Sequence, residues 1–306
     1  KKAIMKKNVI KLMMVSGLLL TFLGCSDDFV NENPESGFQN INQLGEAASN
    51  NPDIVTGFIE GVYSTMYTVG TGGTGGHDDF GHKAYDLFAD FLSSDVALSV
   101  STYGWYRASI TEMQCTEDFT FLDNYQVWRH YYRMIRAANT VIETLGGDEA
   151  DPENPDNRAT LGQALAMRAH SYWYLTQYMQ NDYNPSQEIL PIYRTVTNVG
   201  VGKSTAAEVF ELIESDLNRA IVLLDDYNRP TKTQVNKEVA QAMLAYAIAS
   251  QRDVSRMGEV VALCDAVISG TGATVMTAAE ITGGFNNVAT PGWIWGVDLN
   301  GDIGLR

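Results

Sequence analysis

The sequence predicts a mainly α-helical protein with loop insertions and little β structure. From about residue 53 onward, apolar residues recur at intervals of three and four, which is the spacing of one helix face. Hydrophobic residues make up 45% of the 306 residues, so the chain can bury a sizeable core. Only two short stretches, residues 190–196 and 292–297, have the composition of strands.

The chain is strongly acidic, with 21 Lys and Arg against 37 Asp and Glu and a net charge of -16. Such a surface is unsuited to nucleic-acid phosphates, so we expect no DNA or RNA partner. The segment before Cys25 holds basic residues and no acid, and its removal leaves 16 basic and 37 acidic residues, a charge of -21. An anionic membrane surface would repel this chain, so membrane attachment needs a source other than charge.

Residues 1–24 have the features of a signal peptide. Two lysines begin a basic region, and residues 12–23 form an apolar run of about 18 Å as a helix, too short for the ~30 Å hydrocarbon core of a membrane. Phe22-Leu23-Gly24-Cys25 then resembles a bacterial lipobox, although its phenylalanine stands where leucine is usual. We expect Cys25 to carry lipid. The alternative is a secretory peptide that ends at a cysteine by chance.

Residues 25–52 are predicted to form the lipid anchor and a tether. Ser26, Asp27 and Asp28 are polar, and the segment around Pro34 and Gly37 is rich in turn residues and offers no core. The folded domain is then expected to cover residues 53–306.

The two remaining cysteines, Cys115 and Cys264, lie far apart in the sequence. They form no Cys-x-x-Cys motif and no cluster with histidine that would suggest zinc. We favour a buried free thiol for each, with one disulfide as the alternative.

Seven amphipathic helices follow, each predicted from residues that share one face. Gly146 and Gly147 end the third helix, and Thr205 with Glu208 forms a capping box before the fifth. The inward residues are Ile54, Phe58, Val62 and Met66 in the first; Leu87, Phe91, Leu92 and Val96 in the second, over residues 84–98; Trp128, Tyr132, Ile135, Asn139 and Ile142 in the third; Ala164, Met167, Ser171, Tyr174, Leu175 and Tyr178 in the fourth, over residues 159–180; Phe210, Ile213, Leu217, Ala220 and Leu224 in the fifth; and Val239, Met243, Tyr246 and Ala247 in the sixth, with the seventh over residues 257–268.

Two pairs of these helices resemble each other. Residues 164–169 align with residues 240–245 at an offset of 76, and residues 128–138 align with residues 210–220 at an offset of 82. Bulky residues facing small alanines allow two helices to pack closely, and stacked hairpins of about 34 residues define tetratricopeptide-like solenoids. The alternative is a chance match among alanine-rich helices.

Six motifs occur along the chain in a distinctive order and spacing. They are Cys25-Ser26-Asp27-Asp28, Trp128-x-x-x-Tyr132-x-x-Ile135-x-x-Ala138-Asn139, Arg168-Ala169-x-x-Tyr172, Leu190-Pro191-Ile192, Val209-x-x-x-Ile213-x-x-Asp216-Leu217 and Gln241-Ala242-Met243-Leu244-Ala245. Together they resemble the SusD/RagB family of nutrient-binding outer-membrane lipoproteins of Bacteroidetes. The resemblance covers nearly the whole chain, although the chain lacks the longer carboxy-terminal region of that family, so we expect it to be carboxy-terminally truncated.

This resemblance implies a protein of the outer membrane, lipid-anchored and exposed at the cell surface. It implies binding of an oligosaccharide or other nutrient, delivery to a SusC-like TonB-dependent transporter, and no catalysis or cofactor. The implied fold is a SusD-like helical domain.

An aromatic cluster is the strongest candidate for the ligand site. Sugars present flat apolar faces rimmed by hydroxyls, and exposed rings with nearby polar groups suit them. The segment Tyr103-Gly104-Trp105-Tyr106-Arg107 has three rings in four positions with no helical spacing to explain them. We expect ligand contacts from Tyr103 and Trp105, and also from Tyr67, His77 and Asp78. The alternative is that these rings only cover helix ends.

The glycine-rich segment 70–82 is predicted to be a mobile, solvated loop that borders the ligand or faces the transporter. His77, Asp78 and His82 suggest a metal site only weakly, because nothing fixes their geometry. We therefore expect no metal.

Enzyme motifs are weak or missing. Residues 200–205 resemble the end of a phosphate-binding loop, but Thr197 occupies the position of its first glycine. Neither Gly-x-Ser-x-Gly nor His-Glu-x-x-His occurs. A glycosidase needs only two suitably placed carboxylates, so a surface glycosidase remains an alternative to the glycan-binding protein, as does a helical-repeat scaffold of the envelope.

Overall fold

The structure is a computed structural model that describes residues 41–51, 53–284 and 287–297. The predicted signal peptide, the lipidation site Cys25 and the tether up to residue 40 lie outside the described residues. The chain divides into two units, Lys1–Leu44 and Gly45–Arg306, and apart from the helix that begins at Ile41 everything below concerns the second unit.

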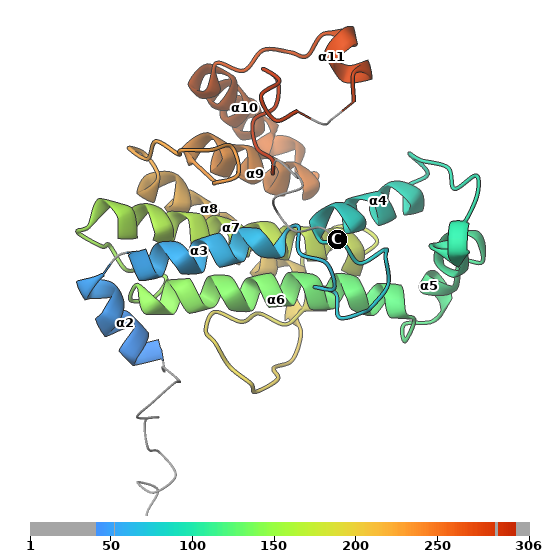
Figure 1. The fold of residues 1–306 in the computed structure, drawn as a ribbon, viewed down its shortest axis with the longest axis horizontal. Helices are drawn as coiled ribbons and strands as arrows, with labels where there is room; N and C mark the ends of the chain where they lie inside the picture. The colour runs from blue at the N-terminus through green and yellow to red at the C-terminus, as the bar shows by residue number, and fades with distance from the viewer. Residues whose placement is uncertain (1–40, 52, 285–286, 298–306) are drawn as a thin grey trace, which may run out of the picture. The chain divides into compact units, whose positions relative to one another are not determined.

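Helices dominate the described chain (Figure 1), which confirms the predicted fold class. The longer helices are α2 (Ile41–Asn50), α3 (Asp53–Thr65), α4 (His82–Leu92), α6 (Leu122–Thr144), α7 (Pro155–Met179), α8 (Ala206–Leu223), α9 (Lys237–Ser250) and α10 (Met257–Thr271). Shorter ones are η2 (Thr102–Gly104), η3 (Arg107–Thr111), α5 (Gln114–Glu117), η4 (Val254–Arg256) and α11 (Ala278–Thr282). Within the described residues no helix is both long and apolar enough to span a membrane.

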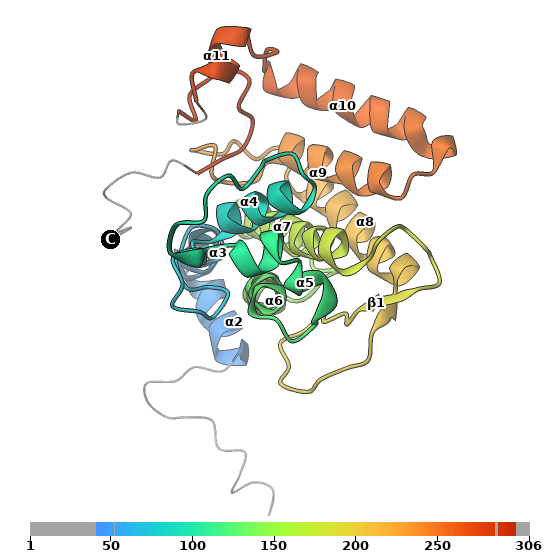
Figure 2. The same ribbon diagram turned by 90° about the vertical axis from the view of Figure 1, so that its right-hand side faces the viewer.

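The helices from α6 to α10 pack in sequence order, each against the next (Figures 1 and 2). Helices α6 and α7 form one hairpin and α8 and α9 a second, while α3 packs against both α6 and α7. This is the tetratricopeptide-like arrangement that the alignment at offsets of 76 and 82 residues predicts. The strands β1 (Glu188–Leu190) and β2 (Ser204–Thr205) pair antiparallel and bracket the connection between the hairpins.

Helix α7 is the centre of the core. It contacts α3, α6, α8 and α9, and its residues from Ala159 to Tyr172 are buried without interruption. Close packing against α8 requires a small residue at one point, since a Cβ at Gly162 would lie 2.8 Å from Leu224 Cγ. Burial on every side explains why no polar face interrupts the middle of this helix.

Local signals set the ends of the central helices. Asn154 accepts hydrogen bonds from two backbone amides at the start of α7, where Pro155 takes the first helical position. Thr205 and Glu208 form the predicted capping box of α8. Gly146 and Gly147, both with positive φ, follow α6 as predicted.

The structure corrects the prediction for the second helix, which ends at Leu92 and not at residue 98. Leu92 and Val96, both predicted to point inward, are exposed. Ser93 and Ser94 explain the early end, because the Ser93 hydroxyl bonds to the Asp90 carbonyl and to Asp95, and Ser94 turns to a positive φ.

Two further predictions on secondary structure and burial are wrong. Residues 292–297 form no strand, because they lie beside a loop and not beside another strand: the Trp295 indole donates to the Thr233 carbonyl at 2.7 Å, and Arg229 donates to the Ile294 carbonyl at 2.6 Å. Tyr246 of α9 is 63% exposed and stacks on Trp173 instead of entering the core.

Both described cysteines are free, which agrees with the prediction of unpaired thiols. Cys115 is buried as expected, and burial raises the pKa of its thiol. Cys264 is exposed on α10, so the expectation of burial is wrong there.

Candidate functional site

Three rings that the sequence singles out meet at the surface. The ring centroids of His77 and Trp105 lie 5.3 Å apart, and those of Tyr103 and Trp105 lie 6.1 Å apart. Tyr103 is 90% exposed, Trp105 is 36% exposed, and His77 is exposed as well. We call His77, Tyr103 and Trp105 the aromatic platform. It combines two chain segments that the sequence separates by about 25 residues.

The backbone around η2 holds the platform in an uncommon conformation. Tyr103 and Tyr106 both have φ of 57°, in the left-handed region that side chains other than glycine rarely occupy. The Ser101 hydroxyl donates to the Trp105 carbonyl at 2.6 Å and closes the turn. Consecutive side chains therefore leave the chain in different directions, and Tyr103 and Trp105 face solvent.

Tyr106 belongs to the core and not to the platform. Its ring stacks on Phe88 at 6.2 Å and contacts Phe91 at 5.2 Å. Burial, followed by the negative charges of Asp78 and Asp123, raises the pKa of Tyr106 to about 12. One ring of the cluster thus covers a helix end while two face solvent, and ligand contact by those two stays a prediction.

The glycine-rich loop is built around a buried carboxylate, so it is solvated only in part, and its mobility stays a prediction. Asp79 is 1% exposed and accepts hydrogen bonds from the Gly72 amide at 2.9 Å, the Thr74 amide at 3.1 Å and the Tyr85 hydroxyl at 2.8 Å. Thr71 bonds to His130 of α6 at 2.8 Å. These bonds tie the segment that bears His77 to α4 and α6.

Asp78 places a carboxylate near the platform. It is half-buried, and its charge acts on both Tyr106 and Asp123. Burial, followed by the charge of Asp78, raises the pKa of Asp123 to about 6. Tyr67 lies half-buried in the turn after α3, and no ring contact links it to the platform among the described residues.

His82 turns away from His77 and into the core. It bonds to the Tyr131 hydroxyl at 3.0 Å, and its ring lies 5.1 Å from that of His170. Burial lowers the pKa of His82. In the described part of the chain, no group of three or more His, Cys, Asp or Glu side chains has the geometry of a metal site.

Apart from the aromatic platform, a hollow of about 250 Å³ opens between α6 and the chain after β1. We call it the second hollow, because the platform is the first candidate site. No pattern in the sequence pointed to this hollow. Trp128, which the helical pattern placed in the core, is only half-buried because it lines this hollow. The other lining residues are Tyr132, Ile135, Arg136 and Asn139 from α6, and Tyr193, Thr195 and Thr197 from the opposite wall.

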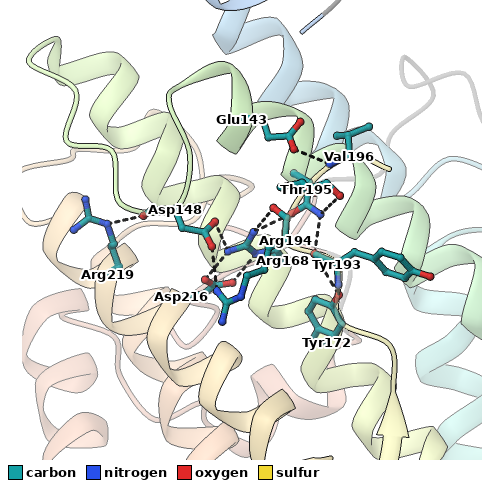
Figure 3. A network of polar contacts seen from close by, with 11 residues as sticks. Glu143, Asp148, Arg168, Tyr172, Tyr193, Arg194, Thr195, Val196, Asp216 and Arg219 are labelled. Carbon is teal, nitrogen blue, oxygen red and sulfur yellow. Dashed lines mark hydrogen bonds and ion pairs between the residues drawn. The ribbon is translucent and has the colours of Figure 1, made fainter. Parts of the chain in front are cut away.

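The wall of the hollow opposite α6, which contains Tyr193, Thr195 and Thr197, is held in place by a buried ion-pair network (Figure 3). Arg168 of α7 is fully buried and donates to both oxygens of Asp216 at 2.7 Å and to Asp148 at 2.8 Å. Burial by itself disfavours the charged guanidinium, but the two carboxylates outweigh it and raise the pKa of Arg168. Arg194 in the wall donates to the same Asp148 at 3.0 Å.

Two further bonds attach the wall to the helices. The Tyr193 amide donates to the Tyr172 hydroxyl at 2.7 Å, and the Val196 amide donates to Glu143 of α6 at 2.8 Å (Figure 3). The network therefore joins α6, α7 and α8 and fixes one side of the second hollow. Since every one of its charges has a partner, its role is structural.

Comparisons with known proteins agree with this architecture. Among solved structures, a SusD-like carbohydrate binding protein from Bacteroides vulgatus ATCC 8482 is 25% identical, with a TM-score of 0.71 over 81% of this chain and 51% of that chain. Surface glycan-binding protein A from Bacteroides thetaiotaomicron in complex with laminarihexaose is 17% identical, with a TM-score of 0.55 over 73% of this chain and 44% of that one.

A laminarin binding SusD-like protein is 19% identical, with a TM-score of 0.57 over 77% of this chain and 49% of the other. The chain thus spans about half the length of these solved relatives. A search of curated proteins found no match. Residues 73–247, more than half of the chain, match the SusD-like family model described as "Starch-binding associating with outer membrane". The chain therefore belongs to the SusD-like family.

Proposed function

We propose that this chain binds an oligosaccharide on the outer membrane and delivers it to a SusC-like TonB-dependent transporter, without catalysing a reaction. The aromatic platform is the observation that carries the proposal. Tyr103 and Trp105 offer exposed ring faces, and a sugar ring stacked on them removes apolar area from water. Two related structures bear names that refer to laminarin or laminarihexaose, which supports a glycan as ligand.

The platform suits binding because it is organised before the ligand arrives. The left-handed residues of η2 orient Tyr103 and Trp105, and the bonds to Asp79 fix the loop that bears His77. Less conformational freedom is then lost on binding, which favours affinity. Asp78 at the edge of the rings supplies an acceptor for sugar hydroxyls. Tyr67 has no ring contact with the platform among the described residues, so a ligand that touches both would have to extend beyond the rings.

The proposed attachment to the membrane is a lipid on Cys25. If it is correct, Cys25→Ser moves the protein from the membrane fraction to the soluble fraction, and a mutant retained in the outer membrane of cells without the transporter would contradict it. Exposure at the cell surface predicts that external protease removes the wild-type protein from intact cells.

Calorimetric titration with a panel of neutral hexasaccharides, followed by product analysis after long incubation, tests the function. Laminarihexaose, maltohexaose, cellohexaose and xylohexaose cover different backbone shapes. We expect saturable binding of at least one of them and no cleavage. Cleavage by the purified protein would favour the surface glycosidase. Absence of binding across the panel, together with binding of envelope proteins in pull-down, would favour the helical-repeat scaffold.

A further inference from the structure

Helix α6 carries an unusual concentration of positive charge on its solvent side. Arg129, Arg133 and Arg136 are all exposed, and at 100° per residue they fall within an arc of about 60°. The chain as a whole has a net charge of -16. Within the residues that the structure describes, none of the three guanidinium groups lies within ion-pair distance of a carboxylate.

The partners of these arginines are neutral. Arg129 lies 5.8 Å from the ring centroid of Tyr125 and bonds to its hydroxyl at 3.2 Å. Arg136 donates one hydrogen bond, from Nη1 to the Thr197 carbonyl at 2.8 Å. A guanidinium has five N–H donors, so Arg136 is held in position while donors remain for a ligand. Glu143, an acidic residue further along the helix, is engaged by the Val196 amide.

One residue of the arc, Arg136, lines the second hollow. Trp128 and Tyr132, with ring centroids 4.6 Å apart, form one side of the hollow, and Tyr193 meets Tyr132 edge-on at 5.8 Å. The Asn139 amide is already used, since it donates to the Tyr193 carbonyl and accepts from Arg168. The polar side of the hollow therefore consists of Arg136 and the threonines at 195 and 197.

We propose that this hollow is a second binding site, separate from the aromatic platform, for an acidic sugar residue such as a uronate. The sugar ring packs against Trp128 and Tyr132, and its carboxylate accepts charge-assisted hydrogen bonds from Arg136. A hollow of about 250 Å³ lies just below the range of drug-sized pockets, which fits one sugar residue of a chain. Arg133 and Arg129 extend the positive surface along α6 for further carboxylates of the same chain.

The shape of the hollow favours a sugar over an acidic peptide. Its walls are ring faces gathered around a small space, and an extended peptide would need a longer groove or an open strand edge. The positive charge of Arg136 favours an anion over a neutral sugar. The acidic remainder of the protein surface repels an anion, whereas this hollow attracts it. The inference thus goes beyond the proposed function, which concerns the platform.

Calorimetry with trigalacturonate and with its trimethyl ester tests the proposal. The two ligands have the same backbone, but only the first is charged. We expect saturable binding of trigalacturonate that weakens as salt rises, and binding of the ester weaker by about tenfold or more. Arg136→Gln should weaken trigalacturonate binding by a similar factor, while Arg136→Lys restores part of it and Lys203→Gln, an exposed control, changes it little.

Three results would overturn the proposal. These are equal affinities for acid and ester, unchanged affinity in a folded Arg136→Gln, and binding of hexaglutamate without binding of trigalacturonate. If Arg136→Gln melts far below the parent, the comparison of acid and ester on the wild-type protein carries the test. Trp105→Ala separates the two sites, because it should leave trigalacturonate binding intact while neutral hexasaccharide binding falls. Loss of both in Trp105→Ala would place the acidic sugar on the platform and contradict the second site.

Discussion

The ion-pair network around Arg168 and the aromatic platform around Trp105 are both groups of side chains drawn from distant segments, but they are held in different ways. Arg168 lies on the central helix, fully buried, with every charge paired (Figure 3). Trp105 lies on a connecting turn with left-handed residues on either side and with a ring face open to solvent. Stability and the proposed binding therefore depend on different parts of the molecule, and a substitution in one should leave the other intact.

Removal of Arg168 should have the largest effect. Arg168→Met leaves the carboxylate of Asp216 buried without its partner, which costs about 3 to 5 kcal/mol of unfolding free energy. Urea unfolding measures this cost. Arg194→Gln is the matched control, because Arg194 shares Asp148 but is 51% exposed, so its loss should cost at most about 1 kcal/mol. Equal losses in the two variants would show that burial does not distinguish the pairs.

Three histidines packed in the same core make the free energy of unfolding depend on pH. Burial lowers the pKa of His82, His130 and His170, to about 3 for His130, where the neighbouring His82 and the positive charge of Arg133 add to the effect. The folded chain therefore holds these rings neutral where the unfolded chain, with histidine pKa near 6.5, binds protons. The stability that they contribute is present above about pH 6.5 and is lost as the pH falls toward the folded values.

His130→Gln tests this dependence. Each such histidine contributes a slope of about 1.4 kcal/mol per pH unit, so between pH 6.5 and pH 5 the wild type should lose about 2 kcal/mol more than the variant. The comparison uses the change with pH, so any constant cost of the lost Thr71 contact cancels. Parallel stability profiles for the two proteins would mean that His130 is protonated in the folded state.

Asp79 and Asp78 are neighbours in the sequence, but their removal should change the stability of the fold by very different amounts. Asp79→Ala leaves the Gly72 amide and the Tyr85 hydroxyl without their acceptor and should cost about 1 to 3 kcal/mol in thermal or urea unfolding. Asp78→Ala should change stability little, because its carboxylate is only half-buried and makes no hydrogen bond of this kind. If Asp79→Ala unfolds like the parent, the loop that bears His77 is held by something other than this carboxylate.

The central helices could be predicted because their side chains repeat at the helical period. The faces of α6 to α9 and the capping box at Thr205 follow from spacing that local chemistry enforces. Spacing does not say what covers a face. Trp128 shares the stripe of Ile135 and Ile142, yet the chain over residues 193–197 covers it only in part. Trp128 therefore lines the hollow.

The site could be predicted only in part. Three rings without helical spacing pointed to Tyr103 and Trp105, and His77 does join them. The role of Asp79 could not be predicted, because a glycine-rich segment with an aspartate is equally typical of a solvated loop. Only the fold brings Tyr85 and Thr74 to the Asp79 carboxylate. The basic arc on α6 could have been found from Arg129, Arg133 and Arg136, whose spacing of four and three is visible in the sequence.

The affinity of Trp105→Ala for the neutral hexasaccharide that the wild type binds most tightly tests the central claim most directly. Calorimetry paired with thermal melting should show binding weaker by about five- to 150-fold, or 1 to 3 kcal/mol, with a melting temperature within about 2 °C of the parent. Tyr246→Ala, which removes an exposed ring from α9, should bind like the wild type. Unchanged affinity in a folded Trp105→Ala would contradict a binding site at the aromatic platform.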